Sequence, residues 1–204
     1  MNQRTTKIVF DFGGVLMQHD RQGCLTALRQ LLSDEAITNV LGFGNDRPNT
    51  LRYRFETGKC STQEFLDGVL ALSYPGTNAQ QVIDAWNTIH AGIADSTWRK
   101  LEQLRNQGYR LYLMSNTDAI HWQHTMSLYG NQIDASFDEV FLSFQEGLAK
   151  PDEAFFKKVD KRIADAHQTL FVDDMAVNRL AAQTSVGWKT CGTIDELLQE
   201  LTKE

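Results

Sequence analysis

Six side chains that could take part in chemistry occur just beyond apolar runs of this sequence. They supply one hydroxyl, one amide, one amine and three carboxylates, from Ser115, Asn116, Lys150, Asp11, Asp173 and Asp174. Three carboxylates that converged would repel one another and would need a cation, and ligands that are all oxygen atoms suit Mg²⁺. A lysine and a hydroxyl beside this ion would bind an anion with several oxygens, and phosphate is the commonest candidate. The residue types therefore favour chemistry on a phosphate group.

These groups would support nucleophilic displacement at phosphorus. The metal ion and Lys150 would neutralise charge while one aspartate attacks, giving an aspartyl-phosphate that water later hydrolyses. Asp11 is the best candidate for the nucleophile, because Gly13 and Gly14 follow it and leave backbone N–H groups free to approach a phosphate. Each residue alone has a simpler interpretation as a helix cap, a turn residue or a solvated loop residue. Their combination, with each beyond a predicted strand, is what favours a catalytic site.

Hydrophobic patterns predict an alternation of strands and helices that would position these residues. Strands are expected at 7–10, 109–114, 140–144 and 169–172. We expect Asp95 to cap one helix, which Gly108 ends, and Pro151 to lie in the first turn of another that runs to about residue 163. Thr193 and Glu196 predict a capping box before the terminal helix. Strands separated by helices pair in parallel through right-handed crossovers, which predicts an α/β fold: a three-layer parallel sheet with helices on both faces.

The stretch from about residue 18 to residue 90 contains helical patterns and no convincing strand. Leucines such as Leu25, Leu28 and Leu32 fall at helical spacing, and Ser61 with Glu64 predicts a capping box. We therefore expect a helical insertion after the first strand. In an open parallel sheet, ligands bind in the crevice beyond the carboxyl ends of the strands, so the six polar residues should meet there.

Composition excludes several classes of protein. The 204 residues correspond to about one domain with an addition, and 42% hydrophobic residues suffice for a core. No apolar run approaches the roughly 18 residues that a membrane span needs, and the first residues lack the apolar part of a secretion signal, so we expect a cytoplasmic protein that binds no membrane. The net charge of -6 argues against a nucleic-acid partner. Three widely spaced cysteines suit reduced thiols.

Four segments of the chain resemble the motifs of the haloacid dehalogenase (HAD) superfamily of phosphohydrolases. In chain order they are FDFGGVL at 10–16, LMSNT at 113–117, GLAKP at 147–151 and FVDD at 171–174. The resemblance covers nearly the whole chain and implies a Rossmann-like core. That core would consist of residues 1–17 and 91–204, and residues 18–90 would form a small helical cap of the C1 type. The segment 115–117 with His121 is similar to the subgroup that contains α-D-glucose-1-phosphate phosphatase.

The resemblance implies a role for each candidate residue. It implies that Asp11 and Lys150 are catalytic, and that the phosphate is bound by Phe12, Gly13, Ser115, Asn116 and Lys150. It also implies that Mg²⁺ is held by Asp11, the backbone carbonyl of Gly13, Asp173 and Asp174. The expected activity is hydrolysis of a phosphomonoester of a small metabolite, for example a sugar phosphate, by a monomer or homodimer.

One residue departs from the pattern of the family. Its phosphatases commonly carry a second aspartate, two residues after the nucleophile, as a general acid and base, and this sequence has Gly13 there. General acid and base catalysis increases the reaction rate by roughly 10²- to 10⁴-fold. His19 and Asp20 are candidate substitutes, although an ordinary polar loop is the simpler interpretation of both. Candidates for substrate selection in the expected cap are Arg52, Tyr53, Arg54, Trp86 and His90. The simpler interpretation is that these side chains pack inside the protein or lie on a solvated helix face.

Two other functions stay open at the level of sequence. A 2-haloacid dehalogenase would use Asp11 to attack carbon without a metal, which would leave the acidic pair Asp173 and Asp174 unexplained. A non-catalytic phosphate-binding or regulatory protein is the other alternative, because Gly13 stands at the usual acid/base position. Phosphate release in the presence and absence of Mg²⁺ would separate these functions from a phosphatase.

Overall fold

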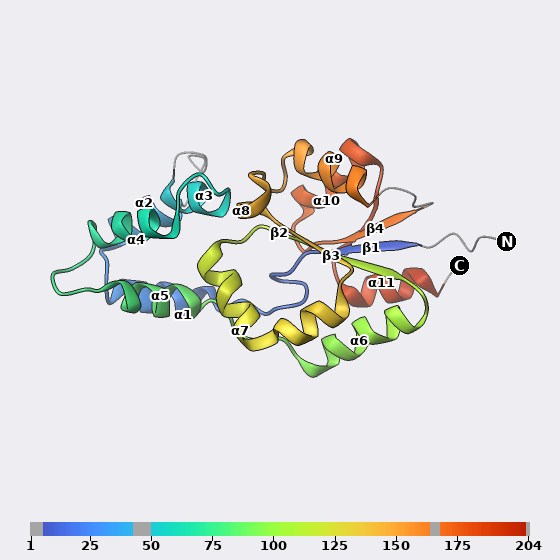
Figure 1. The fold of residues 1–204 in the computed structure, drawn as a ribbon, viewed down its shortest axis with the longest axis horizontal. Helices are drawn as coiled ribbons and strands as arrows, with labels where there is room; N and C mark the ends of the chain where they lie inside the picture. Colours follow the sequence, from blue (N-terminus) through green and yellow to red (C-terminus); the bar gives the residue numbers. More distant parts are fainter. Residues whose placement is uncertain (1–5, 43–49, 164–167, 203–204) are drawn as a thin grey trace.

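The computed structural model describes residues 6–42, 50–163 and 168–202, which build a parallel sheet with helices on both faces (Figure 1). The sheet has the strand order β3-β2-β1-β4-β5. The strands are β1 (Lys7–Phe10), β2 (Arg110–Ser115), β3 (Glu139–Leu142), β4 (Thr169–Val172) and β5 (Lys189–Cys191). All neighbouring strands are parallel, with Ile8 of β1 in register with Leu111 of β2 and Leu170 of β4. The predicted α/β class and Rossmann-like sheet are confirmed.

Helices cover both faces of this sheet and build one core on each. One group is α6 (Asp95–Asn106), α7 (Ala119–Ser136) and α11 (Ile194–Leu201), and the other is α9 (Glu153–Arg162) and α10 (Ala176–Val186). Successive side chains of a strand point to opposite faces. Ile8 and Phe10 of β1 therefore pack with Leu101 of α6, whereas Val9 packs with Phe155 of α9. The fully buried strands explain the continuous apolar runs in the sequence.

In the described part of the chain between β1 and α6, a helical insertion builds a hydrophobic core of its own. Its helices are α1 (Arg21–Arg29), α2 (Asp34–Leu41), α3 (Leu51–Glu56), α4 (Thr62–Leu70) and α5 (Ala79–Asn87). Leu28, Phe65 and Trp86 lie in this core, together with Ile120 of α7. The capping box of Ser61 and Glu64 is present at the start of α4, as predicted. Figure 1 shows the insertion extending from the end of the sheet.

Two connecting segments join the insertion to the sheet and lie against each other. The backbone N–H of Gln18 donates to the carbonyl of Gly92 over 3.0 Å, and the N–H of Ala91 donates to the carbonyl of Gln18 over 3.0 Å. Asp20 continues the ladder by donating its N–H to the carbonyl of Ile89 over 2.9 Å. The expected domain boundaries fall within this paired region and stay a prediction.

Three predicted element ends are wrong, each for a local reason. Ala94 occupies the N-cap of α6 and Asp95 lies in the first turn, where its charge favours the helix dipole. The third strand ends at Leu142, because Ser143 begins the short helix α8 (Ser143–Glu146) and hydrogen bonds through its hydroxyl to the backbone of Thr117. Pro151 precedes α9, whose cap is the carboxylate of Asp152.

The carboxyl-terminal unit differs from the prediction in two respects. Thr193 caps α11 by accepting from the N–H of Glu196, as predicted, but the Glu196 carboxylate accepts from the N–H of Gly192 and so does not complete a capping box. The strand β5 was not predicted, because Lys189–Cys191 is short and lacks an apolar run. In the described parts of the chain, no helix is both long and apolar enough to cross a membrane.

Candidate active site

A cavity of about 420 Å³ opens where the carboxyl ends of the strands face the helical insertion. It brings together most of the predicted site residues, namely Asp11, Phe12, Gly13, Ser115, Asn116, Lys150 and Asp174. Asp173 is the exception: it is completely buried and is absent from the cavity lining. Residues from four separate stretches of the sequence therefore meet at the sheet edge where parallel strands place their ligands.

Lys150 is the centre of the polar contacts in this site. Its Nζ lies 2.8 Å from Oδ1 of Asp11 and 2.7 Å from Oδ2 of Asp173, and the residue is only 2% exposed. The amide of Asn116 holds the backbone of Lys150 at both ends, with 2.8 Å from Lys150 N to Oδ1 and 2.8 Å from Nδ2 to Lys150 O. Asn116 thus positions the lysine, a role that the sequence did not indicate, and its expected contact with phosphate stays a prediction.

Asp173 has both carboxylate oxygens engaged by protein groups. Besides Lys150, its oxygens accept from the N–H of Met175 over 2.9 Å and from Nδ2 of Asn178 over 3.0 Å. Asn178 is buried on the first turns of α10, and its spacing after Asp174 fits the pattern of the HAD superfamily. The arrangement fixes the Asp173 carboxylate and, through it, the position of the Lys150 ammonium.

The three aspartates form a group that could hold a metal ion. One carboxylate oxygen from each of Asp11, Asp173 and Asp174 lies within 4.8 Å of the others. Asp174 is exposed to the cavity, and Gly14, at φ +81°, lets its carboxylate approach the loop, because a side chain there would come within 2.5 Å of Oδ2. A set of hard oxygen donors fits Mg²⁺ better than a softer metal.

Burial and charge set the protonation of the central pair. Burial raises the pKa of Asp11 to about 7, and the nearby Asp173 carboxylate adds to this effect, while Lys150 opposes it. For Lys150, burial disfavours the charged form, but the carboxylates of Asp11 and Asp173 outweigh this and raise its pKa. The lysine therefore stays protonated, and two carboxylates beside one ammonium leave negative charge that a cation can neutralise.

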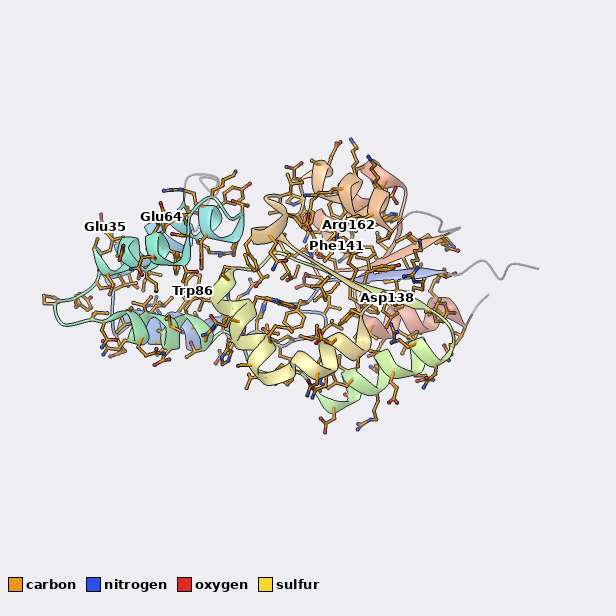
Figure 2. The ribbon with its side chains drawn as sticks, viewed as in Figure 1. Glu35, Glu64, Trp86, Asp138, Phe141 and Arg162 are labelled. Carbon is orange, nitrogen blue, oxygen red and sulfur yellow. The ribbon has the colours of Figure 1, made fainter. Side chains whose placement is uncertain are left out.

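Asp118, His121 and Trp86 form a buried network on the other wall of the cavity. Oδ2 of Asp118 accepts from Nε1 of Trp86 over 3.0 Å and lies 2.8 Å from Nδ1 of His121, whose Nε2 lies 3.0 Å from the Trp86 carbonyl. The two rings stack at 5.2 Å between centroids. Figure 2 shows Trp86 where the insertion meets α7. The network therefore ties α5 of the insertion to α7 beside the sheet.

This network predicts a specific dependence of stability on pH. Burial opposes ionisation of both partners, but their mutual attraction outweighs it, so the pKa of Asp118 is lowered below 3.8 and that of His121 is raised above 6.5. The contribution of His121 is therefore complete below pH 6.5 and is lost as the pH rises through its raised pKa, and that of Asp118 is lost as the pH falls below 3.8. His90 beside it contributes no charge, because burial lowers its pKa to about 3.

We expect His121→Gln to lower the free energy of unfolding by roughly 2 kcal/mol at pH 6 and by less at pH 9. Thermal unfolding of both proteins across this range measures the difference, with His124→Gln, one turn further along α7, as the control. A difference that stayed constant with pH would contradict the charged pairing.

The predicted selectivity residues divide into two groups. Arg52, Trp86 and His90 line the cavity, whereas Tyr53 and Arg54 are absent from its lining, although the structure describes both. Nε of Arg52 lies 2.6 Å from Oε1 of Glu56, so the insertion brings an ion pair to the cavity wall. The leaving group of a substrate held at Asp11 would contact this wall of the cavity.

The two candidate substitutes for the missing acid also differ. Asp20 accepts from the N–H of Gly23 over 2.7 Å as the N-cap of α1 and does not line the cavity. His19 does line it.

Known proteins resemble this chain in sequence and in structure. Residues 7–184 match the family described as haloacid dehalogenase-like hydrolase. D-ribitol-5-phosphate phosphatase of Bacteroides thetaiotaomicron is 30% identical over 181 residues, which cover 84% of each chain. Glyceraldehyde 3-phosphate phosphatase of Pyrococcus abyssi is 34% identical over 92 residues, which cover 44% of this chain and 37% of that protein.

Solved structures support the same relationship. A HAD family enzyme from Bacteroides thetaiotaomicron, in complex with magnesium and inorganic phosphate, superposes with a TM-score of 0.78 at 26% identity, over 92% of this chain and 93% of that one. A predicted HAD-like family hydrolase from Porphyromonas gingivalis gives 0.83 at 26% identity, over 98% and 99% of the two chains.

Proposed function

This chain belongs to the haloacid dehalogenase-like hydrolases, and from that premise we propose that it is a Mg²⁺-dependent phosphatase of a small phosphorylated metabolite. The observation that supports this best is the position of Lys150, whose Nζ lies 2.8 Å from Asp11 and 2.7 Å from Asp173 beside the exposed carboxylate of Asp174. A buried ammonium next to an aspartate and an acidic cluster suits an anionic group that must be both bound and attacked.

In the proposed reaction, a carboxylate oxygen of Asp11 attacks phosphorus. The bond from this oxygen to phosphorus forms while the bond to the leaving oxygen breaks, and the leaving group keeps the electron pair. Water then hydrolyses the aspartyl-phosphate and regenerates the carboxylate. Lys150 neutralises charge on the phosphate, and the hydrogen bond of 2.7 Å from Phe12 N to Oδ1 of Asp11 holds the nucleophile in place. Ser115 and the backbone of Phe12 and Gly13 line the site where the phosphate would bind.

The residues of the site fit a bound Mg²⁺ ion. Asp11, Asp174 and the backbone carbonyl of Gly13 would hold it, and we expect Asp173 to contribute mainly by holding Lys150. When bound, the ion supplies positive charge to the transferring phosphate oxygens. Magnesium and phosphate are present together in the structure of the Bacteroides HAD family enzyme, which supports this choice of metal.

The substrate class follows from the cavity and from the relatives. About 420 Å³ accommodates a small metabolite, and the Arg52–Glu56 pair supplies both donors and acceptors to a leaving group that carries hydroxyls. Two relatives are named as phosphatases of ribitol 5-phosphate and glyceraldehyde 3-phosphate. We therefore propose a sugar phosphate or a sugar-alcohol phosphate as the substrate, with residues 18–90 acting as a cap over it.

Phosphate release from a panel of such phosphates, with Mg²⁺ and with a chelator, tests this function. We expect turnover that requires the metal, and we expect Asp174→Asn to raise the Mg²⁺ concentration for half-maximal activity at least about 10-fold. Asp134→Asn, an exposed aspartate on α7, is the control and should leave the requirement unchanged. Full activity in the presence of the chelator would contradict the proposed dependence on Mg²⁺. Phosphate binding without turnover would favour a phosphate-binding protein.

A further inference from the structure

The ring of His19 fills the space beside Gly13 where a side chain would otherwise stand. A methyl group built on Gly13 would lie 2.1 Å from Cε1 and 2.4 Å from Nε2 of His19, which is closer than non-bonded atoms approach. The imidazole edge that carries Nε2 therefore packs directly on the backbone of Gly13. Gly13 lies two residues after Asp11. Asp11, Gly13 and His19 all line the cavity. A ring nitrogen is thus held on the loop that carries the nucleophile.

The backbone on both sides of His19 is fixed. Gln18 and Asp20 hydrogen bond to the opposite connecting segment, at Gly92 and Ile89, and Asp20 also caps α1 with its carboxylate. His19 itself forms a bridge with His90 across the two segments. The Cα atom of His19 is therefore anchored from both directions, and its side chain alone can adjust to a bound molecule.

Most of the other nitrogen donors on the cavity wall already have partners. Both ring nitrogens of His121 contact Asp118 and the Trp86 carbonyl, and Nζ of Lys150 is shared by two aspartates. Arg52 pairs with Glu56. The ring of His90 lies between those of His121 and His124, at 4.9 and 5.3 Å between centroids, and its Nδ1 is buried without a hydrogen-bond partner among the described residues. His19 is the cavity histidine that contacts the nucleophile loop.

We propose that His19 is a further catalytic residue, whose ring N–H donates a hydrogen bond to the leaving oxygen as its bond to phosphorus breaks. The inference rests on the proposed function. Asp11 forms the new bond to phosphorus, the leaving oxygen keeps the bonding electrons, and solvent supplies the proton that completes the alcohol. The hydrogen bond stabilises the negative charge that develops on this oxygen. An imidazole donates it in the neutral form, when that nitrogen carries the hydrogen, as well as in the charged form.

The role predicts that the contribution of His19 depends on the leaving group. An alkoxide is a poor leaving group and needs the hydrogen bond, whereas p-nitrophenolate stabilises its own charge. We expect His19→Phe, which keeps a ring but has no donor, to lower kcat/KM for ribitol 5-phosphate about 10²-fold and that for p-nitrophenyl phosphate by less than about 3-fold. His19→Gln, which retains an N–H donor, should restore part of the loss. His124→Phe, outside the cavity lining, is the control and should change neither value.

A substitution of Gly13 tests the same contact between His19 and Gly13. Gly13→Ala keeps the backbone carbonyl, but its methyl group must displace the imidazole of His19. We expect it to reproduce the selective loss with the alkyl substrate, and the double variant with His19→Phe to be no worse than either single variant, because both remove the same interaction. Circular dichroism and thermal unfolding test whether each variant folds.

The results separate this inference from the function on which it rests. Equal losses with the two substrates in His19→Phe, or multiplicative losses in the double variant, would overturn the role of His19 while the phosphatase function stands. Wild-type protein that releases no phosphate from either substrate would overturn the function itself.

Discussion

Asp11→Asn is expected to abolish phosphate release, with a fall in kcat of about 10⁴-fold or more, while the protein stays folded. An amide cannot form the aspartyl-phosphate, so no alternative route exists through this residue. The substitution keeps the shape of the side chain and removes a carboxylate whose pKa burial raises to about 7. Because the structure holds this carboxylate at a cost in free energy, the melting temperature measured without metal should stay constant or rise.

Steady-state assays of phosphate release, together with thermal unfolding, check both parts of this prediction. Asp134→Asn is again the control, since this aspartate is exposed on α7. Residual activity above about 1% of the wild-type rate would show that another group attacks phosphorus. A large drop in melting temperature would show instead that the Asp11 carboxylate stabilises the fold.

Lys150→Met should have the largest effect on stability. Lys150 is 2% exposed and contacts the carboxylates of Asp11 and Asp173, both of which are buried. Methionine fills a similar volume but leaves these two carboxylates without a cation, which costs about 3–5 kcal/mol in a buried pair. Activity should fall with it, because the same ammonium neutralises charge on the phosphate. Urea unfolding in a chelator measures the effect without compensation from a divalent ion.

Combining Lys150→Met with Asp11→Asn isolates the cause of this loss. In the double variant only Asp173 remains uncompensated, so the loss caused by Lys150→Met should be smaller in the Asp11→Asn background than in the wild type. An equal loss in both backgrounds would show that the lysine stabilises the protein by packing, for example against Phe171, rather than by charge.

The strands that carry the site were predictable because each combines a fully buried apolar run with a polar residue at its end. The strand at 169–172 has the predicted bounds, and that at 110–115 is displaced by one residue. The rule that parallel strands collect ligands at their carboxyl ends then brings distant segments together without any knowledge of distances. β5 escaped prediction because its pairing with β4 defines it more than its own three residues do.

The contacts around the site were less accessible to sequence analysis. Ser143 acts through hydrogen bonds to a residue that is near in space, and the network of Asp118, His121 and Trp86 joins helices 30 residues apart or more. His19 and Asp20 were equivalent candidates in the sequence. The structure distinguishes them because one side chain caps a helix and the other enters the cavity, a difference of direction between neighbouring residues that composition and spacing do not encode.

The paired connections at residues 18–20 and 89–92 have a consequence for the position of His19. Both links run side by side and hydrogen bond to each other, so the chain enters and leaves the helical insertion through one paired segment. His19 is part of this segment. Loss of this pairing would therefore also release the imidazole from its position beside Gly13.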